Sequence, residues 1–434
     1  MTVDQSYTAA AEAATLPLRV PESVKDVGVR KSVLEELALK ILYLEGPLSL
    51  AQLAEKIHLT SSVVEELYRR LRKEQLCEVT GTDSLGFPDL AITSQGRARA
   101  LELLALNQYS GPAPVSLQSY IHQVRAQSVR HIEVHEPDIE RGFADMVLDD
   151  KVLTQIGTAV NSGGSIFIYG PTGAGKTSIA ERLPLVFAQD RVWIPYAVEV
   201  DGQIIAVYDP LVHRSIAEQE AQKRDARWVL CQRPTVMVGG ELTIEMLDLE
   251  FNPVTKFYVA PAQMKANNGV LIIDDFGRQR LKPEELLNRW VVPLDRRVDF
   301  LTLAGGKKIE IPFELIVVFA TNMDPAELVD AAFLRRIQTK IRLGSVKPEE
   351  FKEIFRRVCT QNGIDYHAET ADEVIQTITD KFKEPLRACY PRDIVSQICW
   401  AARYEGRAPR FDRETATRAM DTYFLSTPEQ IGKQ

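Results

Sequence analysis

A glycine-rich run in the middle of the chain holds the residues with the clearest chemistry. It reads Gly-Pro-Thr-Gly-Ala-Gly-Lys-Thr from 170 to 177 and follows the apolar stretch 165–169. Glycine allows tight turns in which successive backbone N–H groups face one anion. A lysine adds positive charge for the outer phosphates, and a threonine hydroxyl is a magnesium ligand. The run therefore predicts a site for a nucleoside triphosphate and Mg²⁺, made of Gly170, Pro171, Thr172, Gly173, Ala174, Gly175, Lys176, Thr177 and Ser178.

The segments around this loop fit the elements that must position it. Residues 165–169 predict a buried strand, and residues 178–183 can open a helix whose N-terminal dipole favours an anion. A second apolar run, 270–273, predicts another buried parallel strand, which ends at Asp274 and Asp275. Open α/β sheets bind ligands at the carboxyl ends of their strands. We therefore expect Asp274 to hold Mg²⁺, directly or through water, and Asp275 to polarise the attacking water.

Further segments, in this order and spacing, resemble those of AAA+ ATPases from about residue 143 to residue 424. The run 315–322, Leu-Ile-Val-Val-Phe-Ala-Thr-Asn, is similar to the sensor-1 strand of that family. The resemblance implies that Asn322 orients the lytic water and the γ-phosphate. The run 389–394, Cys-Tyr-Pro-Arg-Asp-Ile, resembles the sensor-2 motif, which implies that Arg392 contacts the phosphates from within the same chain. The implied fold class is α/β, with a parallel-sheet P-loop core, a C-terminal all-α lid, and ATP and Mg²⁺ as ligands.

The run 330–337, Asp-Ala-Ala-Phe-Leu-Arg-Arg-Ile, resembles the segment that carries the arginine finger of this family. A finger reaches the γ-phosphate bound by the neighbouring subunit, where its guanidinium neutralises charge in the transition state. Arg336, directly before the apolar Ile337, is the first choice for this role, and Arg335 is the second. The resemblance thus implies ATP hydrolysis between the subunits of a homo-oligomeric ring, which we expect to be a hexamer.

Two features narrow the resemblance. The alternating runs 298–303 and 308–311 turn at Ala-Gly-Gly and predict a hairpin before the sensor-1 strand, similar to the MoxR-like and enhancer-binding branches. The Gly-Ala-Phe-Thr-Gly-Ala loop of sigma-factor activators is absent from the sequence, so that activity is not expected.

Asp275 departs from the Asp-Glu pair that is usual in the family. Its carboxylate lies about 1.5 Å nearer the backbone than the carboxylate of a glutamate would. A displacement of ~1 Å can cost about 10²-fold in rate, so we expect either slow hydrolysis or a shifted loop.

Residues 29–108 predict the order helix, helix, turn, helix, strand, loop, strand, which is that of a winged helix-turn-helix. A DNA-reading helix should have a clear basic footprint. The third predicted helix mixes both signs of charge, with Glu65, Glu66, Arg69, Arg70, Arg72, Lys73 and Glu74. Docking of a protein, docking within the chain, and DNA binding through residues 29–108 all stay open.

The expected domains are a flexible segment 1–28, the winged helix 29–108, a polar linker 109–140, the AAA+ core 141–345 and the helical lid 346–434. Within the core, Asp201-Gly202 between two apolar runs predicts a hairpin. Lys256-Phe257-Tyr258 either lines a central pore and grips a substrate, or belongs to an amphipathic strand that buries one ring.

Composition limits the function classes. The chain has 434 residues, 45% of them hydrophobic, which is enough for two or three domains. Its net charge of −8 counts against nucleic-acid binding by the chain as a whole. Five scattered cysteines without a Cys-x-x-Cys pair fit reduced thiols. No apolar run approaches membrane-spanning length, and no secretory signal is recognised, so we expect a cytoplasmic protein without membrane insertion.

Three functions are consistent with these features. The first is an ATPase ring that remodels a protein or nucleoprotein client recruited by the winged helix. The second is a DNA-binding regulator switched by ATP. The third is a scaffold that assembles on ATP and hydrolyses it poorly, because of Asp275.

Overall fold

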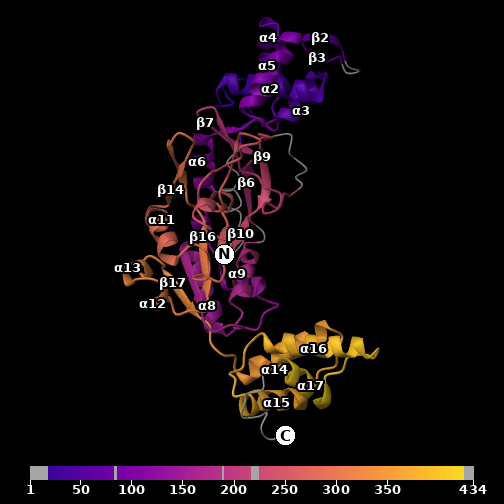
Figure 1. Ribbon diagram of the computed structural model, residues 1–434, viewed down its shortest axis with the longest axis vertical. Helices are drawn as coiled ribbons and strands as arrows, with labels where there is room; N and C mark the ends of the chain where they lie inside the picture. The colour runs from indigo at the N-terminus through magenta and orange to yellow at the C-terminus, as the bar shows by residue number, and fades with distance from the viewer. Residues whose placement is uncertain (1–17, 83–85, 188–189, 217–223, 425–434) are drawn as a thin grey trace, which may run out of the picture. The chain divides into compact units, whose positions relative to one another are not determined.

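The computed structural model describes residues 18–82, 86–187, 190–216 and 224–424 (Figure 1). The chain divides into two compact units. The first comprises Met1–Glu133, Phe187–Ile272 and Gln279–Val317, and the second comprises Val134–Val186, Ile273–Arg278 and Val318–Gln434. Among the described residues, no helix is long and apolar enough to cross a membrane.

The N-terminal part of the first unit combines helices with a small antiparallel sheet in the order β1-β3-β2. α3 and α4 are amphipathic, and Ser49 forms a capping box with Gln52 at the start of α3. The start of α5 needs a glycine, because a Cβ on Gly96 would lie 2.0 Å from a backbone carbonyl oxygen. The elements are α2 (Lys31–Glu45), β1 (Leu48–Ser49), α3 (Leu50–Ile57), α4 (Ser61–Lys73), β2 (Cys77–Thr82), β3 (Pro88–Ile92) and α5 (Ser94–Leu106).

The rest of the first unit is built on a five-stranded sheet in the order β11-β12-β8-β7-β4. Asp201 and Gly202, with φ of 50° and 84°, form the predicted turn between β7 and β8. The predicted hairpin before β16 (Ile316–Thr321) is also present, as the antiparallel pair β14 and β15. The elements are β4 (Val115–Ser116), α6 (Leu117–Ala126), η1 (Val129–His131), β6 (Arg191–Pro195), β7 (Ala197–Val200), β8 (Gln203–Ala206), β9 (Trp228–Gln232), η3 (Glu245–Leu247), β11 (Glu250–Phe251), β12 (Tyr258–Val259), α10 (Ala262–Lys265), α11 (Pro283–Arg296), β14 (Val298–Thr302) and β15 (Lys308–Pro312).

The segment 109–140, expected to be a linker, differs from that expectation because α6 packs into the core. Tyr120 is 1% exposed and belongs to the apolar cluster of the five-stranded sheet. The buried Gln127 donates from Nε2 to the carbonyl oxygen of Trp193 at 2.8 Å and to Oδ1 of Asn268 at 3.0 Å. Gln127, one of the polar residues that suggested a solvated linker, therefore has hydrogen-bond partners far along the chain.

The N-terminal part and the five-stranded sheet share one core. Ala197 and Ile204, from β7 and β8, lie in the same apolar cluster as the helices α2 to α5. The buried Arg227 donates from Nη1 to the carbonyl oxygen of Val27 at 2.9 Å. Residues 18–28, expected to be flexible, thus bury Val27 here, whereas residues 1–17 of that expected segment lie outside the described residues.

The aromatic pair Phe257-Tyr258 packs inside the first unit, Phe257 against this core and Tyr258 within the apolar cluster of the five-stranded sheet. Tyr258 is 1% exposed, and its hydroxyl accepts a hydrogen bond from the backbone N–H of Ala304 at 2.6 Å. Phe257 packs edge-on against Tyr109, with ring centroids 5.6 Å apart. The pore role considered for this pair is therefore wrong, and the alternative with a buried ring is correct.

One sheet has the strand order β10-β13-β16-β5-β17. The second unit holds β5, β17 and the carboxyl ends of β13 and β16, whereas β10 belongs to the first unit. The chain passes between the two units within β13 and within β16. β5, β13 and β16 are almost entirely buried, as their continuous apolar runs predict, and β17 pairs in parallel with β5. The elements of this region are α7 (Glu136–Gly142), α8 (Asp150–Ser162), β5 (Ser165–Tyr169), α9 (Lys176–Val186), β10 (Thr235–Val238), β13 (Val270–Ile273), β16 (Ile316–Thr321), α12 (Pro325–Leu328), α13 (Ala331–Leu334) and β17 (Thr339–Arg342).

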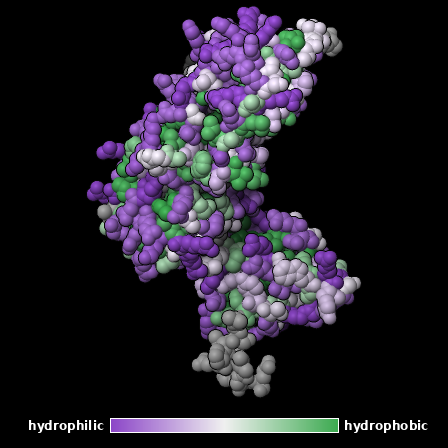
Figure 2. Space-filling view, turned by 45° about the horizontal axis from the view of Figure 1, so that its top comes forward, coloured by the Kyte–Doolittle hydropathy of each residue, from purple (hydrophilic) through white to green (hydrophobic). Residues whose placement is uncertain are grey.

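Helices alone make up the end of the described chain, drawn in orange and yellow in Figure 1. Their apolar faces pack around Phe351, Phe355, Ile394 and Phe411. The face drawn in Figure 2 is mostly hydrophilic, with apolar residues in small groups. The helices are α14 (Pro348–Gln361), α15 (Ala368–Gln376), the π-helical turn η4 (Thr377–Lys381), α16 (Tyr390–Tyr404) and α17 (Arg413–Tyr423). Their role as a lid, like the domain boundaries, stays a prediction.

Candidate nucleotide site

The glycine-rich loop joins β5 to α9 by a path that suits glycine at three positions. Gly170, Gly173 and Gly175 have φ of 143°, 82° and 89°, where L side chains are disfavoured. A Cβ on Gly170 would lie 2.1 Å from a backbone carbonyl oxygen, and one on Gly173 would lie 2.5 Å from Sγ of Cys389. α9 begins at Lys176, so the loop leads into a helix N-terminus, which favours an anion.

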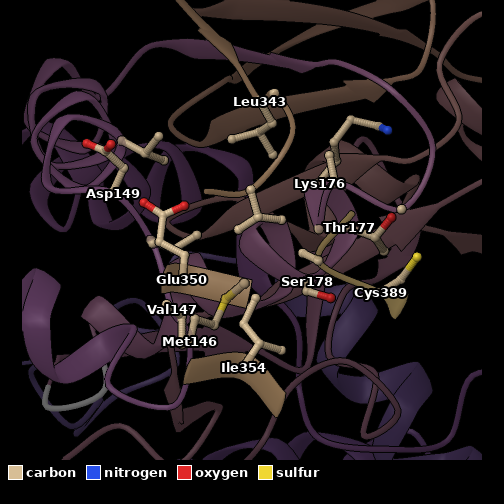
Figure 3. Close-up of a pocket in the computed structure, with 18 of the residues that line it drawn as sticks. Met146, Val147, Asp149, Lys176, Thr177, Ser178, Leu343, Glu350, Ile354 and Cys389 are labelled. Carbon is tan, nitrogen blue, oxygen red and sulfur yellow. The ribbon is translucent and has the colours of Figure 1, made fainter. Parts of the chain in front are cut away.

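This loop forms one wall of an open pocket of about 1080 Å³ within the second unit (Figure 3). The pocket wall includes these predicted site residues: Thr172, Gly173, Ala174, Gly175, Lys176, Thr177, Ser178, Asp274, Asp275, Asn322 and Arg392. Gly170, Pro171, Arg335 and Arg336 are not among the described residues that line it. The fold thus brings together motif residues from four separate segments: the loop, the ends of β13 and β16, and the start of α16.

Thr177 and Asp274 meet where the metal is expected. Oγ1 of Thr177 donates to the Asp274 carboxylate, at 3.1 Å from Oδ1 and 3.0 Å from Oδ2. Mg²⁺ in nucleotide sites takes one or two protein oxygen ligands together with water and phosphate oxygens. A hydroxyl and a carboxylate within hydrogen-bond distance of each other fit that requirement. These two residues would hold Mg²⁺, which would supply charge neutralisation for the phosphates.

Lys176 is buried and turned onto the loop itself. Its Nζ donates to the carbonyl oxygens of Gly170 at 3.0 Å and Pro171 at 2.9 Å. Burial lowers the pKa of Lys176, while the carboxylates of Asp275 and Asp274 act to raise it. Charged phosphate oxygens are stronger acceptors than neutral carbonyls. An incoming phosphate can therefore take over the hydrogen bonds of this ammonium group.

Asp275 lies exposed at the pocket wall in a left-handed backbone conformation, with φ of 49°. Its backbone N–H donates to Oδ1 of Asp274 at 3.0 Å. Aspartate and asparagine adopt this conformation more readily than other non-glycine residues. A glutamate at this position would strain the backbone more, which is a local physical reason for the departure from Asp-Glu.

Asn322 and Arg392 reach the pocket from two segments that lie 70 residues apart in the sequence. Asn322 follows β16, and its Nδ2 donates to Oγ1 of Thr172 in the loop at 3.3 Å. Arg392, in the first turn of α16, donates from Nε to Oδ1 of Asp393 at 3.2 Å, and its side chain is 70% exposed. Asn322 thus already contacts the loop, whereas Arg392 extends from the wall into solvent.

The two candidate finger residues follow α13. Phe333 and Ile337 are buried and anchor this segment, Arg335 is exposed, and Arg336 is half-buried. Neither arginine lines the pocket of its own chain. A finger acts on the site of a neighbouring subunit, so their assignment stays a prediction.

Sequence reasoning missed the apolar end of the pocket. Met146, Val147, Leu343 and Ile354 line the pocket from three segments of the chain. Figure 3 shows Met146, Val147 and Ile354 gathered away from Lys176. Each residue is of a common apolar type in a segment without a motif, so only their positions in the fold identify this surface.

Comparison with known proteins adds a family match at the C-terminus. A family described as a domain of unknown function (DUF8689) matches residues 347–422, which hold α14 to α17. No curated protein matches the chain. Among solved structures it is similar to the Thermotoga maritima RuvB Holliday junction branch migration motor, at 13% identity over 63% of this chain and 69% of that one, with a TM-score of 0.37. It is also similar to domain III of the Thermotoga maritima replication initiation protein DnaA, at 14% identity over 66% and 97%, with a TM-score of 0.38. At these scores the likeness decides neither fold nor function, and the geometry of the pocket has to do so.

Proposed function

We propose that this protein is an AAA+ ATPase that binds ATP with Mg²⁺ in the pocket beside α9 and hydrolyses it in a ring of identical subunits. The observation that carries the proposal is the contact of the Thr177 hydroxyl with both oxygens of Asp274, at 3.1 and 3.0 Å. This contact joins two motifs 97 residues apart at the end of the phosphate loop. A structural turn and an unrelated strand end would have no reason to meet in this way.

Each group of pocket residues would have its own role in such a reaction. The N–H groups of the loop and the ammonium group of Lys176 would bind the phosphates. Asp275 and Asn322, at the ends of β13 and β16, would orient a water molecule for attack on the γ-phosphate. Arg392 would contact the phosphates from α16, and Met146 and Ile354 would pack against the base.

The proposed ring rests on the resemblance of residues 330–337 to an arginine-finger segment. Arg336, or Arg335, would supply a guanidinium to the site of the next subunit, and neither lines the described pocket of its own chain. Hydrolysis would then change the angle between the α/β core and the helices α14 to α17, and so act on a protein or nucleoprotein client.

The charges of α4 favour docking over DNA binding. Arg69 pairs with Glu65 at 2.7 Å, and Arg70 pairs with Glu35 at 3.1 Å and Glu74 at 3.3 Å. Arginines that already pair with carboxylates leave little charge for DNA phosphates. We therefore assign residues 29–108 to protein docking, within the chain or with the client.

Asp275 favours one second candidate, a scaffold that assembles on ATP and hydrolyses it slowly. Its carboxylate is short, and its backbone is fixed by the hydrogen bond to Asp274. Both candidates require ATP binding, and they differ only in turnover.

The test is steady-state phosphate release and equilibrium ATP binding by the full chain at concentrations that form rings. The proposal expects Mg²⁺-dependent turnover by the wild type and loss of both activities in Lys176→Ala. Lys352→Ala is the control, because Lys352 pairs with Asp372 on the helical part and does not line the pocket. Binding without measurable turnover would favour the scaffold, and no binding would reject both candidates.

A further inference from the structure

Residues 387–389, just before α16, donate hydrogen bonds to two backbone carbonyl groups at the tip of the glycine-rich loop. The backbone N–H of Cys389 donates to the carbonyl oxygen of Gly173 at 3.1 Å. Nη1 of Arg387 donates to the carbonyl oxygen of Thr172 at 3.4 Å. The approach is close, because a Cβ on Gly173 would lie 2.5 Å from Sγ of Cys389 and 3.5 Å from Cδ of Arg387.

Holding these two carbonyl groups also orients the N–H groups that follow them. A trans peptide is planar, so its C=O and N–H point in opposite directions. A carbonyl of Thr172 turned toward Arg387 directs the N–H of Gly173 the other way, and a carbonyl of Gly173 turned toward Cys389 does the same for Ala174. The N–H of Ala174 indeed points across the loop to the carbonyl oxygen of Pro171, at 3.3 Å. The two contacts therefore turn two donors toward the interior of the loop, where the phosphates would bind.

Neighbouring residues fix the guanidinium of Arg387. Its Nη2 donates to Oε2 of Glu384 at 2.8 Å, and its Cζ lies 5.7 Å from the centroid of the Tyr390 ring. The hydroxyl of Tyr390 donates to the same Glu384 oxygen at 3.4 Å. Nε of Arg387 is buried without a hydrogen-bond partner among the described residues. Leaving a buried donor unpaired is unfavourable. The side chain nevertheless keeps this position, in which Nη1 contacts the loop and Nη2 contacts Glu384.

We propose that Arg387 is a positioning residue for nucleotide binding, which preorganises the N–H groups of Gly173 and Ala174 and couples the loop to the helical part. This inference rests on the proposed ATP site. Arg387 does not line the pocket and so differs from Arg392, which would contact the phosphates directly. Its removal should weaken nucleotide binding without slowing the chemical step at saturation.

The test compares the full-length wild type with Arg387→Met, which keeps an unbranched side chain in place of the aliphatic part of arginine and removes the donors. A fluorescent ATP analogue reports the dissociation rate, and phosphate release reports KM and kcat. We expect the dissociation rate and KM to rise roughly three- to tenfold, with kcat at saturating ATP unchanged. This is the range for one ordinary hydrogen bond, and the contact of Arg387 with the loop is long, at 3.4 Å. Arg387→Lys keeps one donor and should recover part of the affinity. Arg413→Met, at an exposed arginine that pairs with Glu373, should change neither value.

Amide hydrogen exchange separates this inference from the proposed function, because it needs no nucleotide. In Arg387→Met the N–H of Cys389 should exchange faster than in the wild type, and Glu384→Gln, a milder change, should show a smaller effect in the same direction. Unchanged exchange, or an unchanged KM and dissociation rate in a folded Arg387→Met, would overturn the positioning role. If the wild type binds no ATP, the proposed function is wrong, and exchange alone decides whether Arg387 holds the loop.

Discussion

The phosphate loop and the helix α2 each contain a buried lysine that donates to backbone carbonyl groups. Lys176 donates to Gly170 and Pro171 in the loop, and Lys40 donates from Nζ to the carbonyl oxygen of Asn107 at 3.0 Å. Burial lowers the pKa of both groups, that of Lys40 to about 8. The difference lies in what surrounds each ammonium group.

Lys40 lies within the apolar cluster of α2 to α5, at a position 4% exposed, and it does not line the nucleotide pocket. Lys176 stands at the wall of an open pocket, beside the carboxylates that fit Mg²⁺. Burial and a lowered pKa alone therefore do not identify a functional lysine. A cation becomes a binding group where an anion can approach it and replace its neutral partners.

The comparison predicts the largest effect for the loop lysine. Lys176→Ala should abolish measurable ATP binding, a loss of roughly 10²-fold or more in affinity, because several charge-assisted hydrogen bonds disappear together. Titration calorimetry with Mg²⁺ and ATP measures this loss. Lys40→Met is the matched control, since it removes a buried lysine that also donates to a carbonyl, and it should bind ATP like the wild type. An equal loss of ATP affinity in the two variants would contradict the distinction between the two lysines.

The second effect concerns a cation from outside the pocket. Arg336→Ala, with Arg335 intact, should leave ATP binding unchanged and lower kcat about 10³-fold, because a finger acts only on charge that develops in the transition state. Phosphate release at saturating ATP measures it. Arg335→Ala is the paired variant and should retain most of the turnover. Normal hydrolysis by Arg336→Ala would show that the finger assignment is wrong.

The third effect is a pH dependence of stability at Lys40. Its pKa is about 8 in the folded chain and near the ordinary 10.5 in the unfolded chain. Between these values the unfolded chain binds more protons, so the contribution of Lys40 to the free energy of unfolding rises with pH, by at most about 3 kcal/mol. Denaturant unfolding of the wild type and Lys40→Met from pH 7.5 to 10.5 measures the difference. A difference that is constant across this range would contradict the burial of Lys40.

The smallest effect concerns the short carboxylate. Asp275→Glu should lower the free energy of unfolding by about 1 kcal/mol, because glutamate is less tolerated than aspartate at φ of 49°. Thermal unfolding measures this change, and Asp295→Glu, in α11, is the control for the same chemical change within a helix. Turnover measured in parallel separates the two candidate functions, since a large gain in kcat would support the slow scaffold.

The elements that carry the pocket were predictable because their signals are local. The glycine run and the apolar strands β5, β13 and β16 are each encoded within about ten residues of sequence, as is the Asp-Gly turn at Asp201 outside the pocket. The positive φ of Gly173 follows from the same local pattern. The roles of Asn322 and Arg392 depended on a family resemblance, and the structure adds that both line the pocket.

The rest could not be predicted, because it depends on partners far along the chain. α6 buries one face although its sequence is polar, and Gln127, directly after it, is buried because it pairs with Trp193 and Asn268. Nothing in the local sequence marks Lys40 as buried, because its partner, the carbonyl group of Asn107, lies 67 residues along the chain. Arg387 belongs to no motif, and only its distance to the loop gives it a role.

Titration calorimetry of ATP with and without Mg²⁺, on the wild type and on Asp274→Asn, tests the central claim most directly. The loop and Asp274 are inferred to form one metal–nucleotide site through Thr177. The wild type should bind ATP more tightly with Mg²⁺ than without it, and Asp274→Asn should lose that gain while still binding ATP without the metal. The absence of ATP binding by the wild type, or the same gain from Mg²⁺ in both proteins, would contradict the account.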